Sequence, residues 1–295
     1  MIARSLVRPL LRPVLSSLLC AAALGAALPA LADPATRVVS IGGSVTEIVY
    51  ALAEEDRLVA RDTTSNHPAA VLDLPDVGYI RALSPEGVLS VSPDLILTEE
   101  GAGPPESVEL LRQADIPFAE VPDGFTAQAI LAKIRAVGAA LEVPEKAEAL
   151  AETVGADMQA ALDSVDVKGK RVLFILSMQG GRILASGTDT AADGMIRLVG
   201  AQNAVTSFSG YKPLTDEAVA QAAPDVILMM DRQGDHAAAN EQLFANPAIS
   251  TTPAAKSRAV VRMDGMYLLG FSVRTPDALR DLAAALNAAH GDAEG

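Results

Sequence analysis

Two tyrosines stand at matching places in the two halves of the chain, and each directly follows a glycine. The pairs are Gly78-Tyr79 and Gly210-Tyr211, among only four tyrosines in 295 residues. A tyrosine that loses its proton becomes a phenolate, a hard anionic oxygen donor that suits ferric iron. Because phenol ionises near pH 10 in water, a nearby cation is needed to favour the phenolate at neutral pH. Each half therefore offers one candidate ligand for a hard metal centre.

The residues that follow each tyrosine also repeat. In the first half Glu86 is followed by Pro93-Asp94 and an apolar run, and in the second Glu217 is followed by Pro224-Asp225 at the same spacing. Each copy predicts a short helix opened by Ser or Thr and Glu, then a turn, then a buried strand. Helix–turn–strand units look alike in any α/β protein, but agreement at all these positions favours two related lobes. A small ligand is then expected in the cleft between them.

Strand and helix patterns alternate along the chain and predict an α/β fold of two parallel-sheet sandwich lobes joined by one long helix. Residues 144–165 are rich in strong helix formers and begin with proline. We therefore predict an N-terminal lobe over 33–142, an interlobe helix over 143–166 and a C-terminal lobe over 167–295. Ser44 and Glu47 have the spacing of a capping box for the first helix. A single helical connection predicts small motions on ligand binding.

The first 32 residues have the pattern of a cleaved export signal. Arg4, Arg8 and Arg12 precede a short apolar run, and residues 30–32 read Ala-Leu-Ala, so the mature chain should begin at Asp33. The run is too short for a membrane anchor. The only cysteine, Cys20, lies inside this segment, so the mature protein is expected to lack thiols and therefore disulfides and thiolate chemistry.

The charge of the chain excludes some partners. The net charge is −14, and the leader carries basic but no acidic residues, so the mature protein is still more acidic. Such a protein is a poor candidate for binding nucleic acid or anionic lipid. The chain also lacks the G-x-S-x-G, H-E-x-x-H and P-loop motifs of common enzymes, and the histidine and carboxylate cage expected of a receptor for bare zinc or manganese.

Five segments together resemble one family, the haemin-binding periplasmic proteins of haem ABC importers (HmuT type). They are residues 41–50, 76–89, 187–193, 210–214 and 269–276, and they occur in the family's order over nearly the whole mature chain. The resemblance implies the helical-backbone, class III periplasmic binding protein fold, which is shared with cobalamin and siderophore receptors. It also implies a binding protein that is not an enzyme and that carries haem b as cargo.

The resemblance assigns roles to four residues of the cleft. Tyr79 is at the position of the tyrosine that coordinates haem iron. Arg232 matches an arginine that in some relatives hydrogen-bonds this tyrosine, or it is a solvated loop charge. Tyr211 either contacts the ligand or is a packed tyrosine, and Arg81 either faces a haem propionate or caps the next helix. Some relatives stack two haems by means of a histidine; none stands near residues 177–187, which argues against double loading.

Glu86 and Glu217 are assigned to partner recognition. In the cobalamin and haem receptors, glutamates at these places meet arginines on the two permease subunits. A protein with two related lobes that docks on a two-fold dimer needs one such group on each lobe. Acidity at a helix start, which the helix dipole favours, also explains these glutamates, and both explanations can hold at once. The expected setting is a periplasmic monomer without a membrane span in its mature chain, serving an inner-membrane permease dimer and its ATPase subunits.

Two other functions are kept as alternatives. A corrinoid or ferric-siderophore receptor of the same transporter class would share the fold, but the Val-Gly-Tyr-x-Arg loop around Tyr79 favours haem. An exported enzyme would need a Ser-His pair built from His67 or His236, and no motif supports one. Turnover of a substrate would indicate an enzyme, whereas stoichiometric ligand uptake would indicate a receptor.

Overall fold

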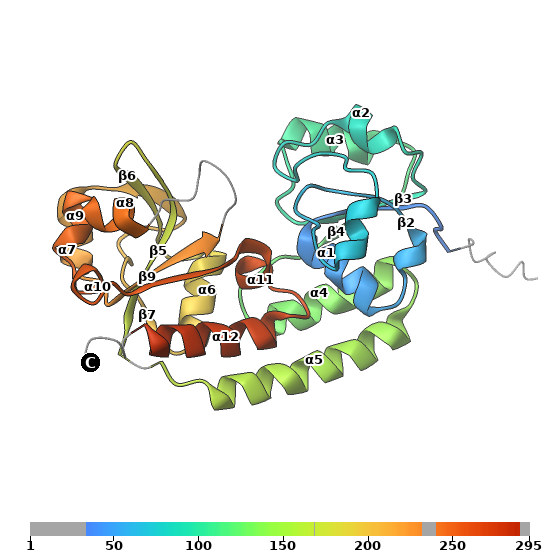
Figure 1. The fold of residues 1–295 in the computed structure, drawn as a ribbon. Helices are drawn as coiled ribbons and strands as arrows, with labels where there is room; N and C mark the ends of the chain where they lie inside the picture. The colour runs from blue at the N-terminus through green and yellow to red at the C-terminus, as the bar shows by residue number, and fades with distance from the viewer. Residues whose placement is uncertain (1–33, 168, 232–239, 290–295) are drawn as a thin grey trace, which may run out of the picture. The chain divides into compact units, whose positions relative to one another are not determined.

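Two β-sheets organise the computed structural model, which describes residues 34–167, 169–231 and 240–289 (Figure 1). The N-terminal sheet is parallel throughout and has the order β2-β1-β3-β4. All four residues of its central strand β1 are buried, as is typical of a parallel sheet covered by helices on both faces. The strands are β1 (Val38–Ile41), β2 (Leu58–Arg61), β3 (Leu95–Glu99) and β4 (Phe118–Val121).

The C-terminal sheet is mixed, with the order β10-β9-β5-β6-β8. Its first three strands are parallel, and an antiparallel unit continues the sheet beyond β5. Gly180 and Gly181, both at positive φ, form the tight turn that reverses the chain after β5. The α/β class is thus confirmed, with an antiparallel hairpin added in the second lobe. The strands are β5 (Arg171–Gln179), β6 (Arg182–Ser186), β7 (Gln202–Asn203), β8 (Tyr211–Leu214), β9 (Val226–Asp231) and β10 (Val260–Asp264).

Helices alternate with the strands in both halves. The N-terminal half has α1 (Gly43–Ala51), η1 (Glu55–Arg57), η2 (Ala69–Asp73), α2 (Pro85–Leu89), α3 (Pro105–Gln113) and α4 (Ala127–Ala140). The C-terminal half has α6 (Ala191–Leu198), α7 (Asp216–Ala222), α8 (Asn240–Ala245), α9 (Pro247–Ser250), α10 (Pro253–Lys256), α11 (Gly265–Leu269) and α12 (Thr275–Ala288). The three short helices from α8 to α10 were not expected from the sequence pattern.

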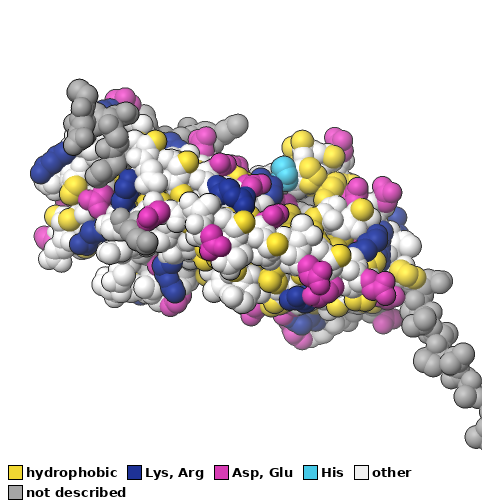
Figure 2. Space-filling view, turned by 90° about the horizontal axis from the view of Figure 1, so that it is seen from below, with side chains coloured by type: hydrophobic (Ala, Val, Ile, Leu, Met, Phe, Trp, Pro, Cys, Tyr) yellow, Lys and Arg dark blue, Asp and Glu magenta, His cyan; other side chains and the backbone are white. Residues whose placement is uncertain are grey.

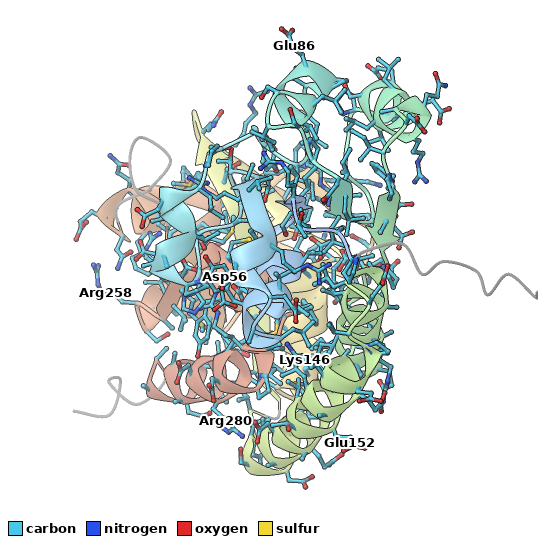
Figure 3. All side chains as sticks on the ribbon, turned by 90° about the vertical axis from the view of Figure 1, so that its right-hand side faces the viewer. Asp56, Glu86, Lys146, Glu152, Arg258 and Arg280 are labelled. Carbon is cyan, nitrogen blue, oxygen red and sulfur yellow. The ribbon has the colours of Figure 1, made fainter. Side chains whose placement is uncertain are left out.

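The long helix α5 (Pro144–Ser164) connects the two halves and packs against α4 and α12, beside which it runs in Figures 1 and 3. One buried apolar cluster extends from Ile134 of α4 through Met158 of α5 to Leu282 of α12 and Phe174 of β5. Both halves therefore share a core along this side, and residues 34–295 form one compact unit. None of the helices in the described part of the chain is long and apolar enough to span a membrane.

The repeated sequence has the same structural role in both halves. Asp94, in the turn before β3, accepts a hydrogen bond from the backbone N–H of Arg37 at the start of the neighbouring strand (2.8 Å). Asp225, in the turn before β9, accepts the equivalent bond from Arg171 (2.8 Å). Each aspartate thereby ties the repeated strand to the first strand of its lobe. The helix of each copy is capped in the same way, by Ser84 and Thr215.

The capping box predicted for α1 is wrong. The helix begins after Gly42, whose φ of 111° favours glycine, and no side chain caps it. Ser44 is buried and donates to Glu99 on the neighbouring strand (2.5 Å). Glu47 is 4% exposed and binds Arg274 of the C-terminal half. In this buried position both side chains bind distant partners and leave the backbone of their own helix uncapped.

Candidate ligand cleft

A cavity of about 290 Å³ lies between the two halves, and both tyrosines line it. The sequence motif thus brings together one Gly-Tyr pair from each lobe. The remaining walls are mostly apolar, with charged groups on the side of the N-terminal lobe. The N-terminal half contributes Thr64, Tyr79, Ile80, Arg81, Glu99, Asp123 and Phe125, and the C-terminal half contributes Ala191, Tyr211, Met266, Leu269 and Gly270.

Tyr79 is held in the cavity by a loop that is fastened to the end of β2. The carboxylate of Asp76 accepts hydrogen bonds from the backbone N–H of Gly78 (2.8 Å) and the hydroxyl of Thr63 (3.1 Å), and it pairs with Arg61 (3.0 Å). Gly78 has a φ of 106°, which favours glycine and explains the residue before the tyrosine. Tyr79 itself is 49% exposed, so its phenol is accessible to a ligand.

The residues on either side of Tyr79 anchor the loop to the N-terminal half. Val77 and Ile80 are buried in the apolar cluster of the N-terminal sheet. Arg81 is exposed and donates to the carbonyl oxygen of Gly101, while Ser84 caps α2. The alternative that Arg81 caps this helix is therefore wrong, and its side chain lies at the edge of the cavity.

Tyr211 is more enclosed than its counterpart. It begins strand β8, where a loop was expected, and its ring lies 6.3 Å from that of Phe174. Burial raises the pKa of its phenol above the ordinary value, although hydrogen bonds from Thr190 and from the backbone of Ala192, at the start of α6, act in the opposite direction. Burial of the Tyr211 phenol thus disfavours its ionisation, although the residue remains 36% exposed.

A buried charge cluster forms part of the cavity wall. The ammonium group of Lys133, a fully buried residue of α4, contacts Glu99, Asp123 (2.9 Å) and Ser44 (3.1 Å). Burial raises the pKa of Glu99, the charge of Lys133 opposes this rise, and the charge of Asp123 adds to it. Burial alone would lower the pKa of Lys133, but its two carboxylate partners hold it above the ordinary value. Glu99 and Asp123 also line the cavity.

A second cavity, of about 340 Å³, shares Phe125 with the first. The Phe125 ring packs edge-on against that of Phe271, with 5.4 Å between the ring centres. Polar and charged groups of α6 and of the loop before it line much of the second space. Its other residues are Thr126, Asp189, Thr190, Asp193, Gly194, Arg197 and Leu198.

The two glutamates assigned to docking are both exposed, in the first turns of α2 and α7. Figure 3 shows Glu86 pointing away from the protein at the tip of α2. Acidic side chains are spread over the face shown in Figure 2 and do not form one patch there. Arg232 lies outside the described residues, as do His236 and the leader with Cys20. His67 is exposed and lines neither cavity.

Sequence reasoning missed the charge cluster entirely. A signal was present at Lys133, which lies three residues after Ile130 and four before Val137, both buried on the inner face of α4. A lysine in the apolar stripe of a helix predicts a buried ion pair. Its partner Glu99 ends β3 and its partner Asp123 follows β4, and only the strand order of the sheet brings them together.

The chain is similar to known proteins in both sequence and fold. A model of the periplasmic binding protein family matches residues 38–267. Among solved structures, the periplasmic heme-binding protein BhuT in complex with two hemes is 41% identical, with a TM-score of 0.82, and the match covers 86% of this chain and 99% of that one.

Curated relatives are more distant. An uncharacterized ABC transporter substrate-binding lipoprotein, YvrC of Bacillus subtilis (strain 168), is 28% identical over 200 residues, which are 66% of this chain and 63% of that protein. This chain thus matches just under two thirds of that relative's length. A vitamin B12-binding protein of Vibrio campbellii (strain ATCC BAA-1116) is 24% identical over 213 residues, 72% of this chain and 75% of the relative.

Proposed function

Because the chain belongs to the periplasmic binding protein family, whose members are substrate-binding proteins of ABC transporters and not enzymes, we propose that it captures haem for such a transporter. The observation that carries this proposal is the pair of Gly-Tyr motifs, one from each lobe, that line a single cavity. The likeness to a heme-binding protein over most of the chain supports the same ligand.

The cavity suits a flat apolar ring with an iron centre and a carboxylate edge. Phe125, Met266 and Leu269 offer apolar surface for the faces of a porphyrin. Tyr79 supplies the axial oxygen to ferric iron, since it is the more exposed of the two tyrosines (49% against 36%) and burial of the Tyr211 phenol disfavours its ionisation. Arg81 pairs with a propionate in this proposal, which its place among the lining residues of the cavity supports.

The first prediction concerns Tyr79. Adding haemin to the purified protein should give a Soret band and a phenolate-to-iron charge-transfer band that saturate at a fixed ratio of haemin to protein. Tyr79→Phe should remove the charge-transfer band and weaken binding by about tenfold or more, since the anionic ligand is lost while the apolar walls remain. Absorbance titration measures both effects.

Tyr211→Phe is the matched control, because it makes the same change in the equivalent motif of the other lobe. We expect this variant to keep the charge-transfer band. Loss of the band in Tyr211→Phe and its retention in Tyr79→Phe would reverse the assignment. Titration with cyanocobalamin tests the corrinoid alternative, which the vitamin B12-binding relative supports: saturable binding of cobalamin without binding of haemin would replace haem as the ligand.

The second prediction concerns the cation that supports the phenolate. If Arg232 hydrogen-bonds Tyr79, then Arg232→Ala should raise the pH at which the charge-transfer band develops, because a nearby positive charge favours the ionised phenol. Thermal stability should stay nearly unchanged. A titration curve identical to that of the wild type would leave the iron itself, or Arg81, as the group that favours the phenolate.

Delivery completes the proposal. The leader over residues 1–32 directs the chain to the periplasm, where the haem-loaded protein docks on a permease dimer in the inner membrane through Glu86 and Glu217. The exposure of both side chains, and their equivalent places in the two repeated helices, support this role. One acidic group on each lobe matches one permease subunit of a two-fold dimer.

A further inference from the structure

An ion pair with a buried carboxylate and a partly exposed guanidinium (24%) joins the two halves beside the ligand cleft. The carboxylate of Glu47, on α1, accepts hydrogen bonds from two nitrogens of the Arg274 guanidinium, of which Nε is at 3.0 Å, and from the hydroxyl of Ser272. Glu47 and Ser272 are 4% and 3% exposed. The carboxylate comes from the N-terminal lobe, and both of its partners precede α12 in the C-terminal lobe.

The same arginine is bound to the helix that forms one wall of the cleft. Its guanidinium lies over the ring of Tyr267, 5.0 Å from the ring centre, and the Tyr267 hydroxyl donates to Asp281 of α12 (2.8 Å). Tyr267 belongs to α11, whose Met266 and Leu269 line the cavity. A chain of polar contacts therefore runs from α1 through Arg274 to α11 and α12.

The start of α1 also packs directly on α11. A Cβ atom at Gly43 would stand 2.5 Å from Cε of Met266 and 2.7 Å from the carbonyl oxygen of Thr64, so only glycine leaves room for the Met266 side chain at this place. Gly43 and Glu47 are thus two contacts between α1 and the segment 265–274. Residues 41–50 and 269–276, which were noted in the sequence for their resemblance to one family, meet at this point.

An ion pair of this kind contributes more to the relative placement of the two lobes than to the free energy of folding. Removing the Glu47 carboxylate from water costs nearly as much as its attraction to Arg274 returns, so the pair contributes little net stability. Its geometry is nevertheless demanding, because a carboxylate that is buried without its partner is costly. The pair therefore selects one placement of α11 against the N-terminal lobe.

We propose that Glu47 and Arg274 are a positioning pair that fixes α11 as a preformed wall of the ligand cleft. Neither side chain is among those that line the cavity, and both act through Met266 and Leu269. The pair lets the ligand enter a site that is already assembled. This inference rests on the proposed function only in taking haem as the ligand.

The test compares Glu47→Gln with Glu54→Gln. Glu54 is also a largely buried carboxylate near the end of α1, but it pairs with Arg57 (3.0 Å) and Lys146 (2.6 Å), away from α11. Amide hydrogen exchange is measured on both variants without ligand. We expect faster exchange across residues 264–275 in Glu47→Gln only, since local opening is favoured when the pair is lost. Equal exchange of this segment in both variants would overturn the proposal, whatever the ligand is.

Haemin titration then tests the link to binding. If the competent arrangement of α11 falls to about a tenth of the population, the apparent affinity of Glu47→Gln falls about tenfold, while that of Glu54→Gln stays near the wild-type value. Faster exchange with unchanged affinity would show that the pair holds the lobes without preparing the cleft, and would overturn its positioning role. If the wild type fails to bind haemin, the proposed function fails, and the exchange result still decides whether the pair fixes α11.

Discussion

Replacing Lys133 by methionine is expected to lower the free energy of unfolding by about 3–5 kcal/mol, the usual cost of removing one partner from a buried ion pair. Methionine fills most of the space of the lysine stem, so little of the loss arises from a cavity. The loss arises because Glu99 and Asp123 share this one ammonium group, and Glu99 is then left in the cavity wall without a compensating charge.

The loss of stability should depend on pH in a defined direction. Burial already raises the pKa of Glu99 above its ordinary value, and without Lys133 the pKa rises further. A carboxyl group whose pKa is raised in the folded state favours folding below its unfolded pKa, and this contribution is lost as the pH rises through the folded pKa. The deficit of Lys133→Met against the wild type should therefore be smallest near pH 4–5 and grow towards pH 8.

Urea unfolding at several pH values measures this deficit, with Arg135→Met as the control. Arg135 lies on the same helix and pairs with Glu148 (2.7 Å), but both side chains are about half exposed, so water replaces the lost interaction. We expect a small, nearly pH-independent effect in the control. A deficit in Lys133→Met that is the same at pH 5 and pH 8 would contradict the assignment of the cost to an unpaired carboxylate.

The fold could be predicted from the sequence because its signals are local or repeated. Asp94 and Asp225 repeat at the same distance before a buried strand, and in both lobes they bind the neighbouring strand as related units should. Strand and helix patterns were sufficient for the α/β class and for the long helix α5. The short helices between β9 and β10 escaped prediction because each has only one turn or slightly more, too short for a periodic pattern.

The site could be predicted only in part, because its charged contacts are distant in sequence. Ser44 and Glu47 have the spacing of a capping box, and nothing local shows that Glu47 meets Arg274, 227 residues further along the chain. Lys133 similarly reaches Glu99, 34 residues away. Sequence patterns report which helix face is buried, but they do not report which buried charges meet. The ligand-binding roles of Tyr79, Arg81, Tyr211 and Arg232 stay predictions.

Reversal of both docking charges, Glu86→Lys with Glu217→Lys, is expected to abolish transporter-dependent haem uptake while haem affinity in solution stays at the wild-type value. Both side chains are exposed and neither lines the cavity, so the changes alter recognition of the permease without touching the haem site. Uptake by cells or by vesicles containing the transporter, together with haemin titration of the free protein, measures the two effects separately.

A control double variant separates docking from helix-end electrostatics. Glu145 and Asp277 are also exposed acidic residues in first helical turns, but they belong to α5 and α12, away from α2 in Figures 1 and 3. Their reversal makes the same unfavourable change at two helix N-termini, and at Asp277 it also removes the pair with Arg280 (2.7 Å), which makes the control the more severe change. If docking requires the lobes' equivalent glutamates, the control pair should transport haem normally. Loss of uptake in both double variants would mean that any reversal of charge is harmful.

The single reversals decide whether the two lobes dock as equivalent halves. If each lobe engages one permease subunit, Glu86→Lys and Glu217→Lys should each give a partial defect, and the double variant should give the full one. Exposed ion pairs are weak individually, on the order of 0–1 kcal/mol, so two are needed for a large effect. Complete loss from one reversal would show that the two lobes do not dock equivalently. Normal uptake by the double variant, or loss of haem binding in it, would remove both glutamates from the docking surface.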